Sequence, residues 1–216
     1  LKEIHHLNSF HDNSINKMHQ LHIAKKNGFK IPSTLVTRKK KQLLDFYNQF
    51  EGNIITKGIG SNIRHMGAKG DVSMQYTEQL SDISIIPEKF APSLFQENIE
   101  KKFEIRTFFL NGSTYSMAIF SQNDNQTQVD FRKYNLKHPN RCVPYNLPKE
   151  IDSKISRLMK ELKLTSGSLD FIYSKEGNYI FLEVNPIGQF RMVSTSCNYY
   201  LEKLVSEYLL KEQVYE

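Results

Sequence analysis

The segment LDFIYSKEGNYIFLEVNP, residues 169–186, constrains the fold of this chain more than any other stretch. Apolar and polar residues alternate on both sides of Glu176 and Gly177, which predicts a β-hairpin with these two residues as its loop. Counting outward from the loop gives three cross-strand pairs: Asp170 with Glu183, Ile172 with Phe181, and Tyr173 with Ile180. A buried-looking hairpin would therefore hold two carboxylates opposite each other.

These carboxylates form a candidate metal site. Asn185 follows Glu183 on the same face of the second strand, because side chains alternate with a period of two. Directly opposed residues have Cβ atoms about 4.5–5.5 Å apart, where like charges destabilise the pair, so a positive partner is expected. An oxygen-only set made of Asp170, Glu183 and Asn185 suits Mg²⁺ or Mn²⁺. The open alternative is that Asp170 ends a strand while EVNP begins a turn, and a one-residue bulge would break this register.

Length and composition indicate a globular protein. The 216 residues are enough for one large domain or two small lobes, and 39% of them are hydrophobic. No window approaches the roughly 18 apolar residues of a membrane span, and no secretory leader opens the sequence. Cys142 and Cys197 show no paired spacing, which is typical of a reduced compartment. We therefore expect a cytoplasmic protein without a membrane partner.

The charge balance favours an anionic partner. The chain has 29 Lys and Arg against 23 Asp and Glu, a formal net charge of +6. A nucleotide, a nucleic acid or an acidic peptide would suit it. The run RKKK at 38–41 precedes an apolar-periodic stretch and is interpreted as a solvated face at a helix start. Basic and aromatic residues do not interleave along one strand as in RNA-binding sheets, so no nucleic-acid partner is expected.

The predicted elements are mixed. Residues 14–28 predict a helix with Ile15, Met18, Leu21 and His22 at helical intervals and Gly28 at its end. Further helices are predicted over 40–50, 148–163 and from residue 197 onward. Strands are predicted over 72–77, 93–99, 104–110 and 114–121, and a glycine-containing loop over 58–71. Hairpins beside helices favour an α+β fold.

Several segments, in order, resemble the ATP-grasp carboxylate ligases. They are NKMHQLHIAKKNGFKIPSTLVT, IITKGIGSN, FQENIEKKFEIRTFFLNG and SLDFIYSKEGNYIFLEVNPIGQF. The resemblance covers residues 14–210 and implies two α+β lobes that clamp ATP. The small lobe would span 14–95, with a flexible phosphate-covering loop at about 58–71. The large lobe would span 96–213, with the metal-binding hairpin at 167–186.

The tail LEVNPIGQFRMVSTSCNYYLEKLVSEYL and the segment DFRKYN at 130–135 resemble a narrower group, the grasp-with-spasm peptide maturases among the graspetide, or microviridin-like, ligases. This resemblance implies an enzyme that uses ATP to join Asp or Glu side chains of a ribosomal precursor peptide to Ser, Thr or Lys side chains. The partner would be that peptide, with a leader and an acidic, hydroxyl-rich core. The group is usually homodimeric, and its N-terminal domain is expected to lie outside this chain.

The resemblance also implies roles for single residues. Asp170, Glu183 and Asn185 would hold the metal, with two Mg²⁺ ions expected and Mn²⁺ as a substitute. Arg106 and Arg132 would be catalytic, binding phosphoryl oxygens with planar guanidinium groups. For Arg132, a surface salt bridge is the open alternative. The nucleotide-binding residues would be Lys17, Lys57, Gln96, Glu97, Ile99 and Glu104.

Two alternatives remain open. The first is an ATP-grasp ligase that adds an amino acid to a peptide or protein terminus with the same metal and phosphate residues. The second is a catalytically incomplete module that binds a nucleotide or a peptide.

Overall fold

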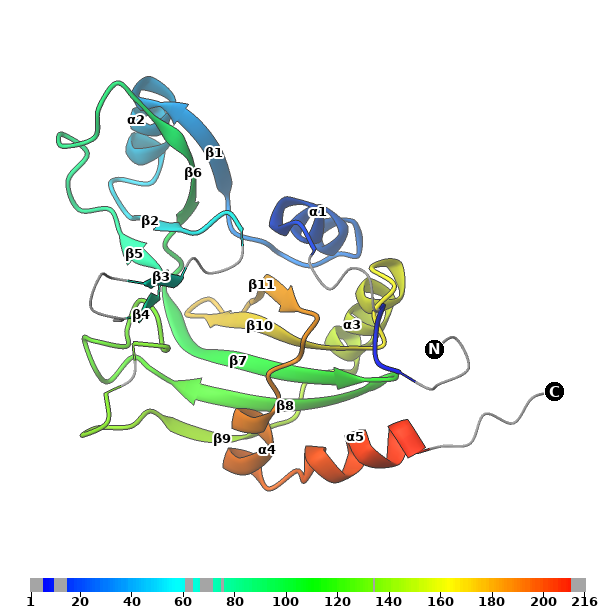
Figure 1. Cartoon of the computed structure of the whole chain (residues 1–216). Helices are drawn as coiled ribbons and strands as arrows, with labels where there is room; N and C mark the ends of the chain where they lie inside the picture. Colours follow the sequence, from blue (N-terminus) through cyan, green and yellow to red (C-terminus); the bar gives the residue numbers. More distant parts are fainter. Residues whose placement is uncertain are drawn as a thin grey trace. The chain divides into compact units, whose positions relative to one another are not determined.

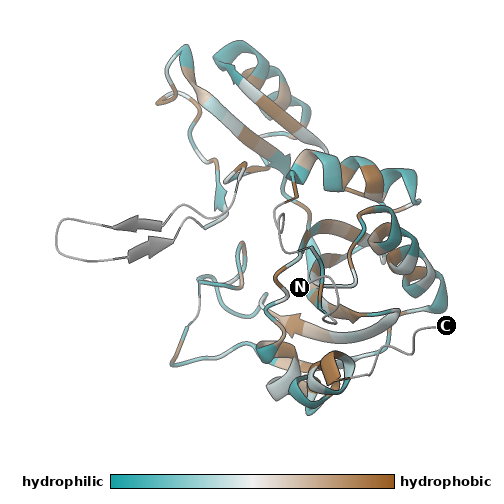
Figure 2. Ribbon diagram, turned by 45° about the vertical axis from the view of Figure 1, so that its right-hand side comes forward, coloured by the Kyte–Doolittle hydropathy of each residue, from teal (hydrophilic) through white to brown (hydrophobic). Residues whose placement is uncertain are grey.

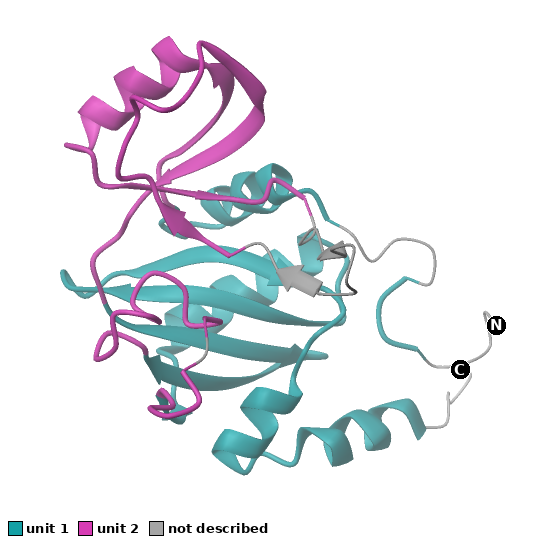
Figure 3. Ribbon diagram, turned by 60° about the vertical axis from the view of Figure 1, so that its left-hand side comes forward, with its two compact units in different colours: residues 1–31, 102–120, 141–216 teal, residues 32–101, 121–140 magenta. Residues whose placement is uncertain are grey.

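A computed structural model describes residues 6–9, 15–60, 64–66, 72–74, 76–133 and 135–210. The chain divides into two compact units (Figures 1 and 3). Unit 1 consists of residues 1–31, 102–120 and 141–216, and unit 2 consists of residues 32–101 and 121–140. Both units are therefore built from segments that are distant in the sequence.

The two units do not follow the predicted lobe ranges 14–95 and 96–213. The first helix belongs to unit 1, because it buries Leu21, Ile23 and Ala24 in the same core as the hairpin. Residues 121–140 belong to unit 2 although they follow a strand of unit 1. The sequence alone does not reveal that the chain leaves one unit and later re-enters it.

Unit 1 is built on a five-stranded sheet. Its strands are in the order β11-β10-β7-β8-β9. Their bounds are β7 Lys101–Leu110, β8 Ser113–Phe120, β9 Arg141–Tyr145, β10 Ser166–Ser174 and β11 Tyr179–Asn185. β11 is the edge strand at one side, so part of its backbone faces away from β10.

The described helices of unit 1 are α1 Lys17–Lys26, α3 Lys149–Glu161, α4 Arg191–Cys197 and α5 Leu201–Leu210. The side chain of Asn16 caps α1 by accepting hydrogen bonds from the backbone of Met18 and His19. Gly28, with φ +82°, lets the chain leave α1. α1 ends close to the predicted position.

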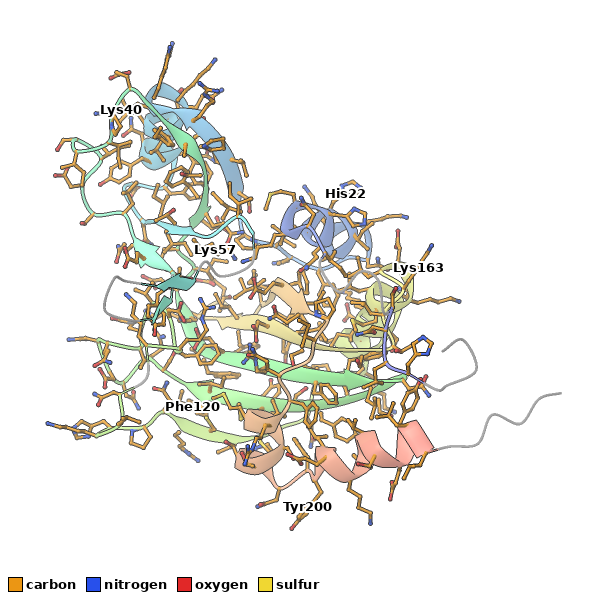
Figure 4. All side chains as sticks on the ribbon, viewed as in Figure 1. His22, Lys40, Lys57, Phe120, Lys163 and Tyr200 are labelled. Carbon is orange, nitrogen blue, oxygen red and sulfur yellow. The ribbon has the colours of Figure 1, made fainter. Side chains whose placement is uncertain are left out.

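The main core lies between the sheet and the helices α1 and α3. The buried residues of this core come from both helices, from β7, β10 and β11, and from the chain next to these elements: Leu21, Ile23, Ala24, Phe29, Ile105, Phe109, Ile151, Ile155, Leu158, Met159, Leu164, Leu169, Phe171, Phe181 and Val184. In Figure 2 hydrophobic residues recur along these elements with hydrophilic ones between them. His22 is exposed on α1, contrary to its predicted place in the apolar series (Figure 4).

The opposite face of the sheet carries polar side chains and α4. Phe108 lies on this face because it alternates with the core residues Ile105 and Phe109, and its ring packs against Phe190 with centroids 5.0 Å apart. Glu104 and Arg106 share the face with Phe108. α4 contacts β8 and β9, so the β7–β10–β11 half is the part that carries charged groups.

Unit 2 contains a four-stranded sheet in the order β1-β6-β2-β5, with α2 beside it. The bounds are β1 Thr34–Lys39, α2 Lys40–Gln49, β2 Ile54–Lys57, β5 Glu78–Gln79 and β6 Lys89–Glu97. Leu43, Ile54 and Phe95 form its buried centre. A further pair of short strands, β3 Arg64–Met66 and β4 Val72–Met74, is antiparallel.

Several predicted elements differ from the structure. The predicted loop 58–71 contains β3, and its residues 61–63 and 67–71 lie outside the described residues. The closing helix predicted from residue 197 begins only at Leu201, as α5, because Asn198 and Tyr200 adopt φ of 54° and 52°, and α4, which precedes it, was not predicted. Tyr200 is exposed at this turn (Figure 4). Strands β5 and β9 were not predicted. In the part of the chain that the structure describes, no helix is both long and apolar enough to cross a membrane.

Candidate metal and phosphate site

The hairpin β10–β11 places Asp170 directly opposite Glu183, as predicted. Its loop has three residues, 175–177, because Ser174 receives a hydrogen bond from Gly177 and donates one to Asn178. The predicted pairs Ile172–Phe181 and Tyr173–Ile180 are therefore wrong: Ile172 faces Ile180 and Tyr173 faces Tyr179. A bulge next to Asp170 shifts the register back by one residue, so the longer loop and the bulge cancel.

Arg106 supplies the first positive partner. Its Nε lies 2.8 Å from Oδ1 of Asp170, and its terminal nitrogen lies 2.9 Å from Oδ2, which is a bidentate pair between β7 and β10. The Arg106 side chain is 9% exposed and the Asp170 side chain 14%. Charge-assisted bidentate bonds of this kind are among the stronger hydrogen bonds in proteins. Two of the predicted site residues thus orient each other.

Lys17 supplies the second positive partner. Its Nζ lies 3.1 Å from Oε2 of Glu183, with the two side chains 20% and 18% exposed. Lys17 begins α1, so the helix delivers a cation to the edge strand. The positive partner expected from the opposed carboxylates is therefore present within the protein as Arg106 and Lys17.

The donor set fits a hard cation. Asp170 and Glu183 offer carboxylate oxygens, and Asn185, the last residue of β11, offers an amide oxygen. A carboxylate oxygen bound to one donor still has a lone pair for a metal. Among the described residues no group of three His, Cys, Asp or Glu is arranged around a metal position. A cation here would share two carboxylates and one amide, with further oxygens from a ligand or water.

Glu104 lies two residues before Arg106 on the same face of β7 and is 7% exposed. It belongs to unit 1 together with Lys17, Arg106, Asp170, Glu183 and Asn185. Six of the predicted site residues are therefore placed in one unit, five of them on three neighbouring strands.

The other five predicted site residues belong to unit 2. Lys57 is the last residue of β2, opposite Leu94 of β6 (Figure 4). Gln96 and Glu97 end β6, and Ile99 follows it. Gln96 is fully buried, and its side-chain Nε2 donates a 2.8 Å hydrogen bond to the Thr34 hydroxyl. Its side-chain oxygen Oε1 has no hydrogen-bond partner among the described residues. Because β2 and β6 are antiparallel, Glu97 at the end of β6 lies opposite Ile54 at the start of β2, three pairs away from Lys57.

Arg132 is bound to the nearby Asp130. Its Nε lies 2.9 Å from Oδ1 and its terminal nitrogen 2.6 Å from Oδ2. Burial raises the pKa of Asp130, but the Arg132 guanidinium and the backbone amides of Thr77 and Arg132 outweigh it and hold this pKa below its usual value. Arg132 is therefore held by a salt bridge to Asp130, the alternative to its predicted role in phosphate binding.

Neither cysteine is prepared to act as a nucleophile. Burial raises the pKa of Cys142 above its usual value, and burial with the nearby Cys142 raises the pKa of Cys197 to about 11. Both thiols are therefore protonated near neutral pH. Cys197 is also buried, at 7% exposure.

Sequence reasoning missed two residues that hold the strands of this site. Gln20 of α1 hydrogen-bonds the backbone of Val184, the residue between Glu183 and Asn185. Asn8 donates to the carbonyl oxygens of Ser166 and Pro186 and accepts from the backbone of Ser166. A polar residue within the buried face of a helix was a signal for Gln20. Nothing in the sequence connects Asn8 to residues 158 positions away.

Comparison with known proteins supports the ATP-grasp fold, confirming the predicted fold class. No family model matches the chain, and no curated protein matches it. Among solved structures, the macrocyclase MdnC of Microcystis aeruginosa MRC, bound with precursor peptide MdnA, has a TM-score of 0.75 and 28% identity. The match covers 90% of this chain and 59% of MdnC.

Two further structures define what the chain resembles. A Chryseobacterium gregarium RiPP-associated ATP-grasp ligase, in complex with ADP and a leader and core peptide, gives a TM-score of 0.77 at 27% identity, covering 89% of this chain and 57% of the ligase. The ATP-grasp ligase PsnB, with a precursor variant, Mg and ADP, gives 0.69 at 20% identity, covering 91% and 58%. The chain thus spans less than two thirds of these proteins. The predicted resemblance to graspetide-type ATP-grasp peptide maturases is confirmed.

Proposed function

We propose that this chain carries the catalytic centre of an ATP-dependent ligase that macrocyclises a ribosomal precursor peptide. The observation that carries the proposal is the paired carboxylates Asp170 and Glu183, each with its own cation, on a sheet of the ATP-grasp fold. The similarity to MdnC, solved with a precursor peptide, supports the substrate class. The partner would be a precursor with a leader and an acidic, hydroxyl-rich core.

The reaction proposed has two steps. A peptide Asp or Glu carboxylate attacks the γ-phosphorus of ATP, which gives an acyl phosphate and ADP. A Ser or Thr hydroxyl, or a Lys amine, then attacks the acyl carbon and releases phosphate, leaving an ester or an amide. Each crosslink removes one water from the peptide. Because two anions meet in the first step, positioning and charge neutralisation supply most of the catalysis.

In this proposal Asp170, Glu183 and Asn185 hold Mg²⁺, which when bound neutralises charge on the ATP phosphates. Two ions are proposed, with Mn²⁺ able to replace them. Arg106 binds phosphoryl oxygens through the guanidinium N–H groups that do not bond Asp170. Lys17, which pairs with Glu183 in the structure, would bind a phosphate oxygen with Glu183 holding the metal.

The remaining predicted site residues complete the proposal. Lys57 contacts the α- and β-phosphates, and the backbone from Gln96 to Ile99 binds adenine with Glu97 taking its exocyclic amine. Glu104 of β7 binds the ribose, and Arg132 binds the acyl phosphate. The ADP bound to the C. gregarium ligase supports a nucleotide as ligand. A homodimer is proposed by family analogy alone, and sedimentation velocity would test it.

The deciding experiment incubates the full-length protein with the precursor peptide encoded beside it, ATP and Mg²⁺, and records the intact peptide mass. Loss of about 18 Da per crosslink, the mass of one water by simple stoichiometry, is the expected result. Asp170→Asn and Glu183→Gln should abolish it, with Arg157→Met, an exposed position of α3, as the matched control. A mass gain would instead indicate amino-acid ligation, and nucleotide binding with an unchanged mass would indicate a catalytically incomplete module.

A further inference from the structure

Gln20 of α1 is a buried side chain with an unusual set of partners. It is 3% exposed, and its amide lies against the outer edge of β11. Its Nε2 donates to the carbonyl oxygen of Val184 at 3.0 Å, and its Oε1 accepts from the backbone amide of Val184 at 2.9 Å. Nε2 also donates to the carbonyl of Ile15 at 3.1 Å. The side-chain amide therefore pairs with one residue of the edge strand as a neighbouring strand would.

The clamped residue lies between two of the candidate metal ligands. The amide of Val184 belongs to the peptide group it shares with Glu183, and its carbonyl belongs to the peptide group it shares with Asn185. Gln20 holds both peptide groups at once. Val184 itself is 2% exposed and packs into the core, which resists rotation of the strand. The directions in which Glu183 and Asn185 leave the backbone are set by these two peptide groups.

The position needs such a clamp. The pairing with β10 is irregular between Asp170 and Phe171, and among the described residues β11 has on its other side only an isolated bridge with Lys30. Toward the loop, the edge is held at Phe181, whose amide donates to the carbonyl of Lys30 at 2.9 Å. On the other side of the bulge, the hydrogen bonds of Gln20 to Val184 hold the edge of β11. An edge strand with a bulge would otherwise be free to twist where the carboxylate must be aimed.

The same side chain also places Lys17. Residues three apart on a helix lie on neighbouring positions of one face, so the contact of Gln20 with Val184 carries Lys17 to Glu183, where the ion pair measures 3.1 Å. One helical turn thus supplies both the backbone clamp and the cation. A change at Gln20 would alter the ligand and its counter-ion together.

We propose that Gln20 is a positioning residue for the metal site, acting through the backbone of β11 on Glu183 and Asn185. The inference rests on the proposed function, in which these two residues hold Mg²⁺. Residues behind metal ligands typically change metal affinity by about 10- to 100-fold when they are substituted. Gln20 differs from them in holding the ligands by the backbone, so its loss would misalign two ligands at once.

The test measures how ADP binding by the full-length protein depends on Mg²⁺, with isothermal titration as the readout. In Gln20→Met, which keeps the size of the side chain and removes its hydrogen bonds, the half-saturating Mg²⁺ concentration should rise about tenfold. ADP binding in the presence of a chelator should stay at the wild-type level. Hydrogen exchange at the amide of Val184 should become faster, because its acceptor is gone.

Controls separate positioning from loss of stability. Ile155→Val and Ile155→Ala remove small and large parts of a fully buried side chain of α3 in the same core, and they should leave the Mg²⁺ dependence unchanged. If they shift it as far as Gln20→Met does at equal loss of thermal stability, the proposal is overturned. If Gln20→Met does not fold, Gln20→Glu retains the acceptor for the Val184 amide and should give a smaller shift. An unchanged Mg²⁺ dependence in Gln20→Glu would then overturn the proposal.

Failure of the proposed function gives a different result. Asp170→Asn and Glu183→Gln in the same titration should weaken Mg²⁺ dependence more than Gln20→Met does. If wild-type ADP binding is indifferent to Mg²⁺, or if these two variants behave as wild type, the metal site itself is refuted and the role of Gln20 with it. If they respond and Gln20→Met does not, only the role of Gln20 is refuted.

Discussion

Two arginine–aspartate pairs in this chain have nearly the same geometry and different origins. Arg106 and Asp170 are 64 residues apart and meet because β7 and β10 are neighbours in one sheet. Arg132 and Asp130 are two residues apart and meet within one loop. Both pairs are bidentate, with contacts between 2.6 and 2.9 Å. The first is a product of the tertiary fold, whereas the second is encoded locally and needs only a turn.

The two arginines also differ in burial, and this difference indicates which role each can fill. Arg106 is the more buried of the two, at 9% exposure against 30% for Arg132. Removing one member of a buried ion pair leaves the other charge buried without a partner, so substitutions of Arg106 and Asp170 should have coupled effects on stability. Arg132 is more accessible and can change partners with less rearrangement. Four substitutions, ordered by expected effect, test this view.

The largest effect is expected for Arg106→Met, which leaves the Asp170 carboxylate in a largely buried position without this cation. Its free energy of unfolding in urea should fall by about 3 kcal/mol. The double variant Arg106→Met/Asp170→Leu should recover part of this loss, because no charge then stays behind. A loss below about 1 kcal/mol for the single variant would show that the pair is no stronger than an exposed one.

The second effect is expected for Asp130→Asn, at about 2 kcal/mol near neutral pH, the size of hydrogen bonds to a charged group. Because the folded-state pKa of Asp130 is lowered, its stabilisation is present above the unfolded value of about 3.9 and is lost as pH falls through the lower folded value. Urea unfolding of the wild type and of Asp130→Asn, at pH 7 and below about pH 3.9, measures this loss of stability. A difference that persists undiminished in acid would contradict the assignment.

A third, smaller effect is expected for Lys17→Met, at about 1 kcal/mol, because the pair with Glu183 is partly exposed. Lys25→Met, at an exposed position of the same helix, is the control and should change stability by about 0.5 kcal/mol or less. Urea unfolding of the two variants in parallel gives the comparison. Equal losses would mean that Lys17 contributes through the helix and not through Glu183.

The smallest effect is expected for Lys26→Met. The Lys26 side chain is 64% exposed, although its Nζ lies 2.5 Å from Oε1 of Glu161. Solvent screening should make this loss the smallest of the four, and added salt should reduce it further. Unfolding at low and high ionic strength measures both. A loss as large as that of Asp130→Asn would show that distance, not burial, decides the strength of these pairs.

The sequence predicted the chemistry of the hairpin better than its geometry. The alternation of residues and the two carboxylates indicated a hairpin and an oxygen site, and Asp170 does face Glu183. The loop was assigned one residue too short, because a three-residue loop with a left-handed Gly177 also follows such a pattern. The bulge that compensates is a tertiary feature, and no local pattern in the sequence reports it.

Long-range contacts explain most of the other differences. α1 was predicted from its periodicity, but its membership of the unit that contains the hairpin depends on contacts of Gln20 and Leu21 with residues far along the chain. Asn8 binds residues near position 166 for the same reason. Lys57 and the end of β6 were identified as neighbours in function, and the structure pairs β2 with β6. Their roles toward a nucleotide stay predictions.

The bulge in β11 also separates the tip of the hairpin from its base. Residues 175 and 176 are exposed at the tip, while Asp170 and Glu183 lie on the other side of the irregular pairing. The base is tied down independently, at Arg106, Lys17 and Gln20. The tip is therefore a place where foreign sequence, such as a fluorophore attachment site or an epitope, can be inserted without changing the alignment of the two carboxylates.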